Sequence, residues 1–274
     1  IEVENRATRT IVHNGLMYGA ELAGSTIEMP NLFTRKPVVR VQGSIRVTAD
    51  ELDRFIDESP MKQTKAIRFQ DVDIDGERLR RAYSLASACL ADVPRHITVK
   101  RIQDGRVSNH LNDTIAEGAK LYVLGPSGNF TVEPRAVNQR HLVMIAGGSG
   151  ITPIMSLAET LLRSESQTRI FLIYGNRGWD DVIFRDRIAA LTDELPARFV
   201  VDHVLQDPPS GWEGDCGLLS AEVLERRLQA LPALRDDALY FLCGPSPMMD
   251  AAHEVLRERG VAASRIQEER FTQS

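Results

Sequence analysis

The chain is 274 residues long, which is enough for two domains of roughly 100–150 residues each. Hydrophobic residues make up 43% and charged residues 26%, so collagen-like, low-complexity and wholly disordered chains are excluded. The formal net charge of -5 argues against nucleic acid as the main partner. No apolar run is long enough for a membrane span, and three separated cysteines favour a reducing compartment, so we expect a cytoplasmic protein.

The first half of the chain is predicted to form a small antiparallel β-barrel over residues 37–137. Residues 1–36 show no convincing period and are left as an unplaced N-terminal extension. The expected strands are short and separated by Gly, Asp and Pro turns: Val38–Val47, Ala66–Ile74, Leu79–Ala86, Ile97–Ile102 and Leu121–Leu124.

Residues 138–274 are predicted to form an α/β domain with a doubly wound parallel sheet, because apolar strands alternate with amphipathic helices. The expected strands are His141–Ala146, Ile170–Tyr174, Phe199–Leu205 and Leu239–Cys243. The expected helices are Ile154–Leu162, Val182–Leu191, Ala221–Leu231 and Met248–Arg259.

The strand Leu79–Ala86 places Arg81 and Tyr83 on one face, since alternate strand residues point the same way. Such a pair can hold a phosphate by the guanidinium and a planar ring by the phenol. These residues fit a purely structural barrel strand with a salt-bridged arginine about as well as they fit a ligand site.

The segment Gly105-Arg106-Val107-Ser108 predicts a short helix that Ser108 caps and Gly118 ends, and its N-terminus is available to an anion. Taken alone, this segment is best interpreted as a capped surface helix.

The strongest motif is Gly147-Gly148-Ser149-Gly150-Ile151-Thr152-Pro153, directly after an apolar strand. We expect Thr152 as N-cap and Pro153 as first helical residue. Glycines let a ligand approach the backbone, and a helix start offers N–H groups to a phosphate, so a dinucleotide pyrophosphate fits; a plain strand-to-helix turn is the alternative. Pro153 stands where the G-x-G-x-x-G fingerprint has its last glycine, which weakens assignment to ordinary Rossmann dehydrogenases.

A fourth motif, Cys243-Gly244-Pro245, ends an apolar strand and is predicted to enter a helix through Ser246 as cap and Pro247. It would place Cys243 at the carboxyl end of a parallel strand, where open α/β sheets bind ligands. A lone strand cysteine more often only packs.

In this order and spacing, the four motifs resemble the ferredoxin-NADP reductase superfamily of flavoenzymes over roughly residues 66–271. The greatest similarity is to the reductase module of bacterial oxygenase systems of the phenylacetyl-CoA or ketosteroid type. The resemblance implies that the barrel binds FAD and the α/β domain binds NADPH or NADH.

The resemblance also implies roles for individual residues. It assigns Arg81 to the flavin pyrophosphate, Tyr83 to the isoalloxazine or ribityl part, and Ser84 to a hydrogen bond near flavin N5. A second flavin diphosphate contact comes from Gly105, Val107 and Ser108. The dinucleotide motif comprises Gly147, Gly148, Gly150, Thr152 and Pro153, and the segment beside the nicotinamide comprises Cys243, Gly244 and Pro245. The implied catalytic group is Ser84, Cys243, Glu269 and Phe271, the last two from the ending Glu269-Arg270-Phe271.

The cysteine content implies that the iron–sulfur centre of such systems lies elsewhere, because three scattered cysteines cannot supply the four ligands of a plant-type 2Fe-2S cluster. The expected partner is a ferredoxin-type 2Fe-2S domain beyond Ser274 or a separate protein, followed by an oxygenase. The six histidines form no metal-binding pair such as H-E-x-x-H, so no metal site is expected.

The expected reaction is therefore hydride transfer from NAD(P)H to FAD, followed by transfer of single electrons to an iron–sulfur carrier. Arg177 and Arg185 favour NADPH slightly, while Asp180 and Asp181 keep NADH open. Two alternatives remain: a regulatory protein that binds flavin and dinucleotide without turnover, and a flavin reductase that releases free reduced flavin.

Overall fold

A computed structural model describes residues 21–22, 25–26, 45–46, 66–90, 92–93, 95–116 and 123–271. The chain divides between Glu133 and Pro134 into two units, each with its own internal contacts. Several expectations fall outside the described residues. They are most of the strand at residues 38–47, most of the N-terminal extension, and Gly118 as the end of the short helix.

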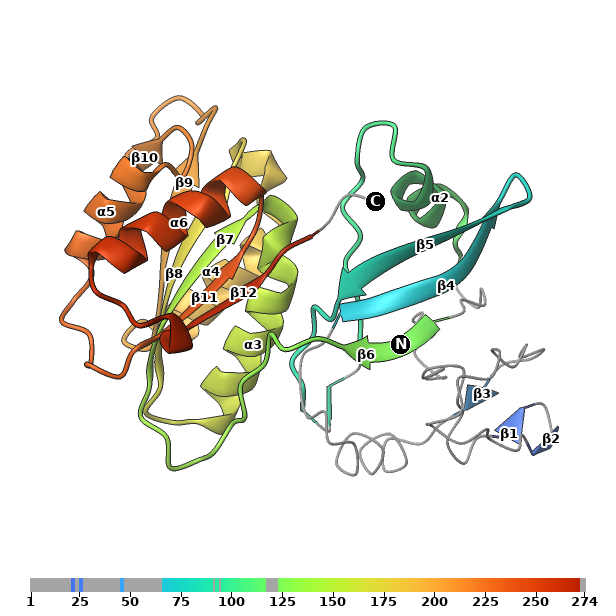
Figure 1. Ribbon diagram of the computed structural model, residues 1–274, viewed down its shortest axis with the longest axis horizontal. Coiled ribbons are helices and arrows are strands. Elements are labelled where there is room, and N and C mark those ends of the chain that lie inside the picture. The colour runs from blue at the N-terminus through green and yellow to red at the C-terminus, as the bar shows by residue number, and fades with distance from the viewer. Residues whose placement is uncertain are drawn as a thin grey trace. The chain divides into compact units, whose positions relative to one another are not determined.

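The first unit contains antiparallel sheets (Figure 1). One has the strand order β5-β4-β6, and the other has the order β2-β1-β3. Asp75 and Gly76 connect β4 to β5, and both have positive φ angles (54° and 78°), as a two-residue hairpin turn requires. The bounds are β1 Glu21–Leu22, β2 Ser25–Thr26, β3 Ile45–Arg46, β4 Ala66–Ile74, β5 Glu77–Ser84 and β6 Val123–Ser127, and helix α2 spans Arg106–Thr114.

The expected strand at Ile97–Ile102 is wrong. Only Ile97 pairs, through a single antiparallel bridge to Leu85. The preceding residues are held by side chains instead of a strand ladder: the Arg95 guanidinium donates to three carbonyl oxygens, and the Ser87 hydroxyl accepts from the His96 N–H. These bonds fix a loop, which an apolar pattern alone does not distinguish from a strand.

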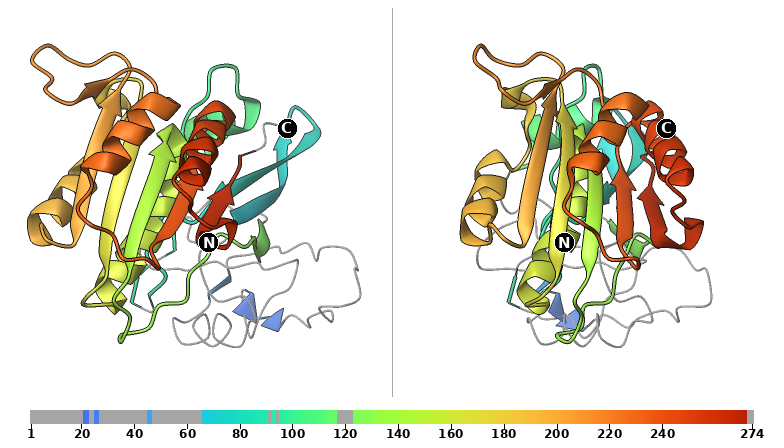
Figure 2. Two further views of the ribbon diagram at one scale, coloured as in Figure 1. Left: turned by 60° about the vertical axis from the view of Figure 1, so that its left-hand side comes forward. Right: turned by 90° about the vertical axis from the view of Figure 1, so that its left-hand side faces the viewer.

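The second unit is built on a six-stranded parallel sheet with the order β10-β9-β8-β7-β11-β12. Helices α3 and α4 cover one face of this sheet, and α5 and α6 cover the other (Figures 1 and 2). The strands are β7 His141–Gly147, β8 Arg169–Asn176, β9 Phe199–Leu205, β10 Asp215–Cys216, β11 Leu239–Cys243 and β12 Ile266–Glu269. The α-helices are α3 Ile151–Ser164, α4 Arg185–Glu194, α5 Ala221–Ala230 and α6 Ser246–Glu258.

The central strand β7 explains the continuous apolar run, because residues 142–146 are completely buried between the two helix layers. From β7 the chain runs outward through β8, β9 and β10, and then returns to the other side of β7 as β11. Ligands bind outside the carboxyl ends of the strands at such a reversal. The antiparallel first unit and the doubly wound parallel second unit confirm the predicted fold class.

Candidate functional site

Strand register in the second unit brings three motifs together that are far apart in the sequence. Gly147 at the end of β7 pairs with Gly175 of β8, and Ala146 pairs with Cys243 of β11. On the outer side, Cys243 pairs with Glu269 of the edge strand β12. The glycine motif, the cysteine motif and the terminal glutamate therefore lie side by side at one edge of the sheet.

Close packing of two backbone turns accounts for the glycines at this edge. A Cβ atom on Gly150 would lie 2.1 Å from the carbonyl oxygen of Cys243, and one on Gly244 would lie 2.9 Å from the Gly147 nitrogen. At Gly148 the reason is different, because its φ angle of 52° disfavours any side chain. Gly147 and Gly150 are thus required by packing within the protein, in addition to any room that they leave for a ligand.

The three predicted helix caps are wrong. Helix α3 begins at Ile151 with Gly150 as N-cap, because the 3-10 turn Gly148–Gly150 runs directly into it. The Thr152 hydroxyl donates to the Ser149 carbonyl instead of capping. Helix α6 begins at Ser246, with Pro245 as N-cap.

The first unit shows the same pattern at α2, whose N-cap is Gly105. Ser108 is buried inside the helix, where its hydroxyl donates to the Gly105 carbonyl and accepts from the Ile102 N–H. A Cβ atom on Gly105 would lie 2.5 Å from the Ser108 hydroxyl oxygen, so the turn needs glycine at position 105 for the Ser108 side chain to fit.

Helices α2, α3 and α6 therefore begin without a side-chain cap and without an acidic residue in the first turn. By contrast, the Ser220 hydroxyl caps α5 by accepting from the Val223 N–H, and Glu222 lies in the first turn of that helix. Uncapped N-termini leave N–H groups and the positive end of the helix dipole available to an anion. These three helix starts are the ones that the motifs indicate as phosphate or nicotinamide contacts.

Cys243 and Glu269 share one face of the sheet, since paired residues of adjacent parallel strands point the same way. The Cys243 side chain is fully buried. Burial, with a smaller contribution from the negative charge of Glu269, raises the pKa of the Cys243 thiol well above its usual value. Cys243 is thus a neutral thiol at physiological pH, so it is unsuited to act as a nucleophile.

The residues expected to distinguish the two dinucleotides lie between the end of β8 and the start of α4. The Arg177 guanidinium donates to Asp207, with 3.0 Å between Nε and Oδ2. Arg185 lies 3.6 Å from Asp180 and 3.5 Å from Asp186. Both arginines are therefore already paired with carboxylates.

An aromatic cluster at the same strand ends escaped sequence reasoning. The rings of Tyr174 and His203 are 5.8 Å apart, His203 and Trp179 are 5.2 Å apart, and Trp179 and Trp212 are 5.6 Å apart. The Tyr174 hydroxyl donates to the Gly148 carbonyl, which connects the cluster to the glycine turn. No pattern in the sequence links these residues, because they come from separate segments.

Arg81, Tyr83 and Ser84 lie on β5 in the first unit. Burial raises the pKa of the Tyr83 phenol, and the positive charge of Arg81 opposes this shift, so the two side chains are close in space. Ser84 is buried. At the start of α2, Arg106 donates to Glu77 at 2.5 Å and thereby attaches that helix to the β4–β5 hairpin.

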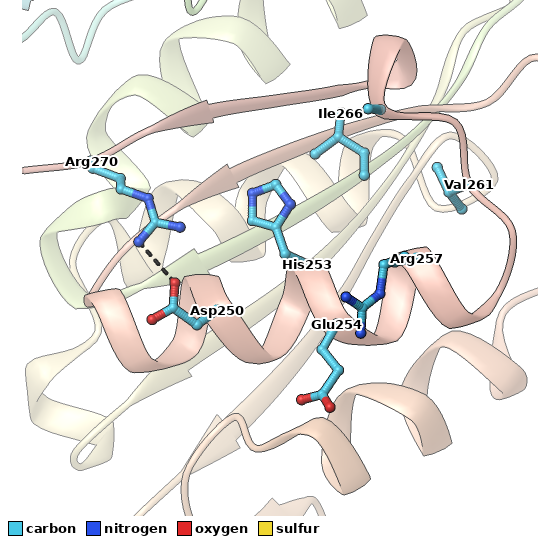
Figure 3. A pocket seen from close by; sticks show the side chains of 8 residues that line it. Asp250, His253, Glu254, Arg257, Val261, Ile266 and Arg270 are labelled. Carbon is cyan, nitrogen blue, oxygen red and sulfur yellow. Dashed lines mark hydrogen bonds and ion pairs between the residues drawn. The ribbon is translucent and has the colours of Figure 1, made fainter.

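A pocket of about 450 Å³ lies between α6 and β12, at the outer edge of the second unit (Figure 3). Arg270 donates to Asp250 at 2.9 Å and to Glu268 at 3.3 Å, and Glu268 is also 2.6 Å from His253. These bonds attach both neighbours of Glu269 to α6. Phe271, which follows Arg270, is 41% exposed.

Neither a metal centre nor a membrane span is found in the part of the chain that the structure describes. Within those residues, no group of three or more His, Cys, Asp or Glu residues is arranged to hold a metal ion. None of the helices described above is long and apolar enough to cross a membrane.

Comparison with known proteins gives two family models. The oxidoreductase FAD-binding domain matches residues 60–132, and the oxidoreductase NAD-binding domain matches residues 144–254. These matches fall in the first and second units, respectively.

Individual relatives point the same way. The chain is 37% identical over 205 residues to one of the subunits of 1,2-phenylacetyl-CoA epoxidase from Escherichia coli, covering 72% of this chain and 55% of the relative. It is 33% identical over 254 residues to the ferredoxin reductase component of 3-ketosteroid-9-alpha-monooxygenase from Rhodococcus rhodochrous, covering 90% of this chain and 68% of the relative. The chain thus spans between about half and two thirds of these relatives.

A solved structure shares the fold. The cytochrome P450 reductase of Amycolatopsis superimposes with a TM-score of 0.64 at 27% identity, covering 76% of this chain and 60% of that protein.

Proposed function

The chain belongs to the ferredoxin-NADP reductase superfamily of FAD- and NAD-binding oxidoreductases, and from this premise we propose that it oxidises NAD(P)H and delivers single electrons to a ferredoxin-type 2Fe-2S carrier. The carrier would in turn serve an oxygenase. Support for the acceptor comes from relatives described as a ferredoxin reductase component and as part of an epoxidase. The carrier is either a further domain or a separate protein.

The residues of the first unit fit a flavin diphosphate. Such a group needs cationic and N–H donors, and the unit offers the Arg81 guanidinium together with the uncapped start of α2. We assign Gly105, Val107 and Ser108 to the same contact, with the Ser108 hydroxyl shaping the turn. Tyr83 and Ser84 follow Arg81 on β5 and are assigned to the flavin ring.

The residues of the second unit fit a nicotinamide dinucleotide. Its pyrophosphate would bind the N–H groups at the start of α3, and its nicotinamide end would lie at the Cys243-Gly244-Pro245 turn. The observation that carries the proposal is the register that places Cys243 between Ala146 and Glu269. It gives one buried neutral thiol and one carboxylate at a single edge of the sheet.

The protein's contribution is orientation and electrostatics. FAD held by these residues would supply the chemistry that connects two-electron hydride transfer from a nicotinamide to one-electron transfer. Glu269 supplies a fixed negative charge, and the bonds from α6 to Glu268 and Arg270 hold the strand that carries it. The buried, neutral thiol of Cys243 keeps the interior behind the Gly244-Pro245 turn apolar.

The experiment is anaerobic reduction of a 2Fe-2S ferredoxin by NAD(P)H in the presence of the purified chain. We expect catalytic bleaching of the iron–sulfur spectrum. A flavin that stays bound but is never reduced would instead indicate a regulatory protein. Reduced flavin that separates from the protein on ultrafiltration would indicate a flavin reductase.

A pair of arginine variants tests the flavin assignment. Arg81→Ala removes a charge-assisted phosphate contact worth about 1.5–3 kcal/mol, so we expect FAD to bind about 10- to 150-fold more weakly. Arg101→Ala is the matched control, because the Arg101 guanidinium is bonded to Asp113 on the same unit. Equal FAD retention by the two variants would reject the role of Arg81.

A further inference from the structure

Glu165 is a fully buried carboxylate at the C-terminal end of α3. Its Oε1 atom accepts from the Arg135 N–H at 3.0 Å and from the Asn138 side-chain amide at 2.7 Å. The Arg140 guanidinium lies 3.1 Å from the same oxygen, and the Thr168 hydroxyl donates to Oε2. One carboxylate thus gathers four partners, and three of them come from the segment that precedes β7.

This segment joins the two units, which divide between Glu133 and Pro134. We call residues 134–140, from this division to the start of β7, the connection. None of these residues is buried, and Val137 is 84% exposed. Since the connection places no side chain in the core, its position depends on polar contacts.

Backbone bonds complete the attachment of the connection to the second unit. The Asn138 N–H donates to the Arg135 carbonyl at 2.9 Å and closes a turn. The Arg140 N–H donates to the Thr168 hydroxyl at 3.2 Å, and the Arg169 N–H donates to the Arg140 carbonyl at 2.8 Å. The connection therefore enters the second unit along one fixed path.

Stability alone gives little reason for a negative charge at position 165. Burying a carboxylate costs several kcal/mol of lost hydration, and a buried ion pair is often no more stabilising than apolar residues of the same volume. What a carboxylate adds is geometry, because its two oxygens accept from several donors in defined directions. At Glu165 these donors belong largely to the part of the chain that joins the two units.

Glu165 lies too far from the glycine motif to contact a pyrophosphate bound there. It follows the last residue of α3, whose first turn follows that motif, and the 14 residues of the helix separate its two ends by about 20 Å. Any effect of Glu165 on the reaction has to pass through the connection. Such an effect can be large, because a misplacement of reacting atoms by about 1 Å can reduce the rate roughly 100-fold.

We propose that Glu165 is a positioning residue for hydride transfer, and that it acts by fixing the connection between the flavin-binding unit and the dinucleotide-binding unit. This inference rests on the proposed function, because that function requires a nicotinamide on one unit to reach a flavin on the other. A loosened connection spreads the two cofactors over many arrangements, so productive encounters become rarer. Each unit still binds its own cofactor as before.

The test is stopped-flow reduction of the FAD-loaded chain by NADH or NADPH, whichever reduces the unmodified chain faster. Asn138→Ala removes the side-chain bond from the connection to Glu165 and leaves the other partners of the carboxylate in place. We expect the limiting rate constant at saturating dinucleotide to fall at least fivefold. The dissociation constants of FAD and of the dinucleotide should change less than twofold.

Thr192→Val is the matched control for a loss of stability alone. It removes a half-buried hydroxyl that donates to the Ile188 carbonyl within α4, so it weakens the second unit without touching the connection. The limiting rate constant of this variant should equal that of the unmodified chain. If Asn138→Ala does not fold, Asn138→Ser, whose side chain is one bond shorter than that of asparagine, takes its place under the same criteria.

Hydrogen exchange of the unmodified chain checks the attachment itself. The backbone N–H groups of Arg135 and Asn138 should exchange at least 100-fold more slowly than in an unstructured peptide, because both are bonded. Exchange as fast as in an unstructured peptide would show a mobile connection and would overturn the role of Glu165.

Equal rate constants for Asn138→Ala and Thr192→Val would also overturn this role, while the proposed function would stand. A loss of FAD or dinucleotide affinity that accounts for the slower reduction would overturn it as well, because the effect would then be on binding. The proposed function fails separately if neither dinucleotide reduces the flavin of the unmodified chain, and the role of Glu165 in hydride transfer falls with it.

Discussion

Gly150→Ala tests the packing of the two turns that form the candidate site. The new Cβ atom would lie 2.1 Å from the Cys243 carbonyl oxygen, 2.4 Å from its carbon and 2.8 Å from the Gly244 nitrogen. Real Cβ atoms essentially never come within 3.0 Å of such neighbours, so one of the turns has to shift by about 1 Å.

The cost should be high because the obstructing atoms are backbone. β11 is paired with β7 on one side and with β12 on the other, so it cannot move aside as a flexible side chain would. Overpacking usually costs about 1–3 kcal/mol, and we expect about 3 kcal/mol here. In a unit of this size that corresponds to a decrease of roughly 10 °C in the unfolding temperature.

Tryptophan fluorescence during thermal unfolding reports this unit specifically, since both tryptophans, Trp179 and Trp212, belong to it. Gly178→Ala is the matched control. Its Cβ atom would meet nothing closer than 3.6 Å, and its φ angle of -132° is ordinary for alanine, so we expect a change within about 0.5 kcal/mol. Equal unfolding temperatures for Gly150→Ala and Gly178→Ala would refute the packing argument.

Three further predictions concern buried and titratable groups of the second unit. Glu165 is a fully buried carboxylate that pairs with Arg140 and accepts hydrogen bonds from Asn138 and the Thr168 hydroxyl. Glu165→Gln should therefore lower the free energy of unfolding, measured by urea denaturation, by about 3 kcal/mol. A change below about 1 kcal/mol would contradict this. Burial lowers the pKa of His203 below its usual value of 6.5, so the free energy of unfolding should decline as the pH falls below about 6.5. His203→Gln should flatten this part of the curve of stability against pH. An unchanged curve in the variant would count against the role of His203. Iodoacetamide at about pH 8 should label the exposed Cys216 and leave Cys243 unlabelled by peptide mass spectrometry until the protein unfolds; labelling of Cys243 in the folded protein would show that its thiol is not buried.

The sequence predicted those elements that are buried on both sides. β7 and β11 are central strands, so every residue from 142 to 146 has to be apolar and the pattern is unmistakable. The edge strand β12 escaped prediction for the opposite reason. It pairs on one side only, and its sequence Ile266-Gln267-Glu268-Glu269 therefore tolerates polar residues that hide its period.

The N-caps of α2, α3 and α6 were placed one to three residues too late, because the turns before them were interpreted through side chains. The expected helix at Val182–Leu191 was placed too early instead, since α4 begins at Arg185. Capping rules predict a serine or threonine at the N-cap, whereas Gly105, Gly150 and Pro245 occupy that position in the structure. An uncapped start is expected where an external anion takes the place of the cap. Helix α4 also lacks a side-chain cap, but Asp186 lies in its first turn, so the signal for the site is a missing cap together with a first turn free of acidic residues.

The motifs identified the candidate residues, but their partners were not visible in the sequence. Arg177 and Asp207 are 30 positions apart, and they become neighbours only because β8 and β9 are adjacent in the sheet. The attachment of β12 to α6 through His253 likewise depends on which helix covers that edge. Such pairs decide the charge balance, so the preference for NADPH that Arg177 and Arg185 suggest in the sequence loses its basis once both are paired with carboxylates.

The most direct measurement of the central claim is an anaerobic titration of the purified FAD-loaded chain with NADH and, separately, with NADPH, following the visible absorbance of the flavin. We predict that the flavin bleaches after one equivalent of at least one of the two dinucleotides. A protein that takes up no FAD, or whose bound flavin keeps its oxidised spectrum with both dinucleotides, would contradict the assignment of this chain as an NAD(P)H-dependent flavoenzyme.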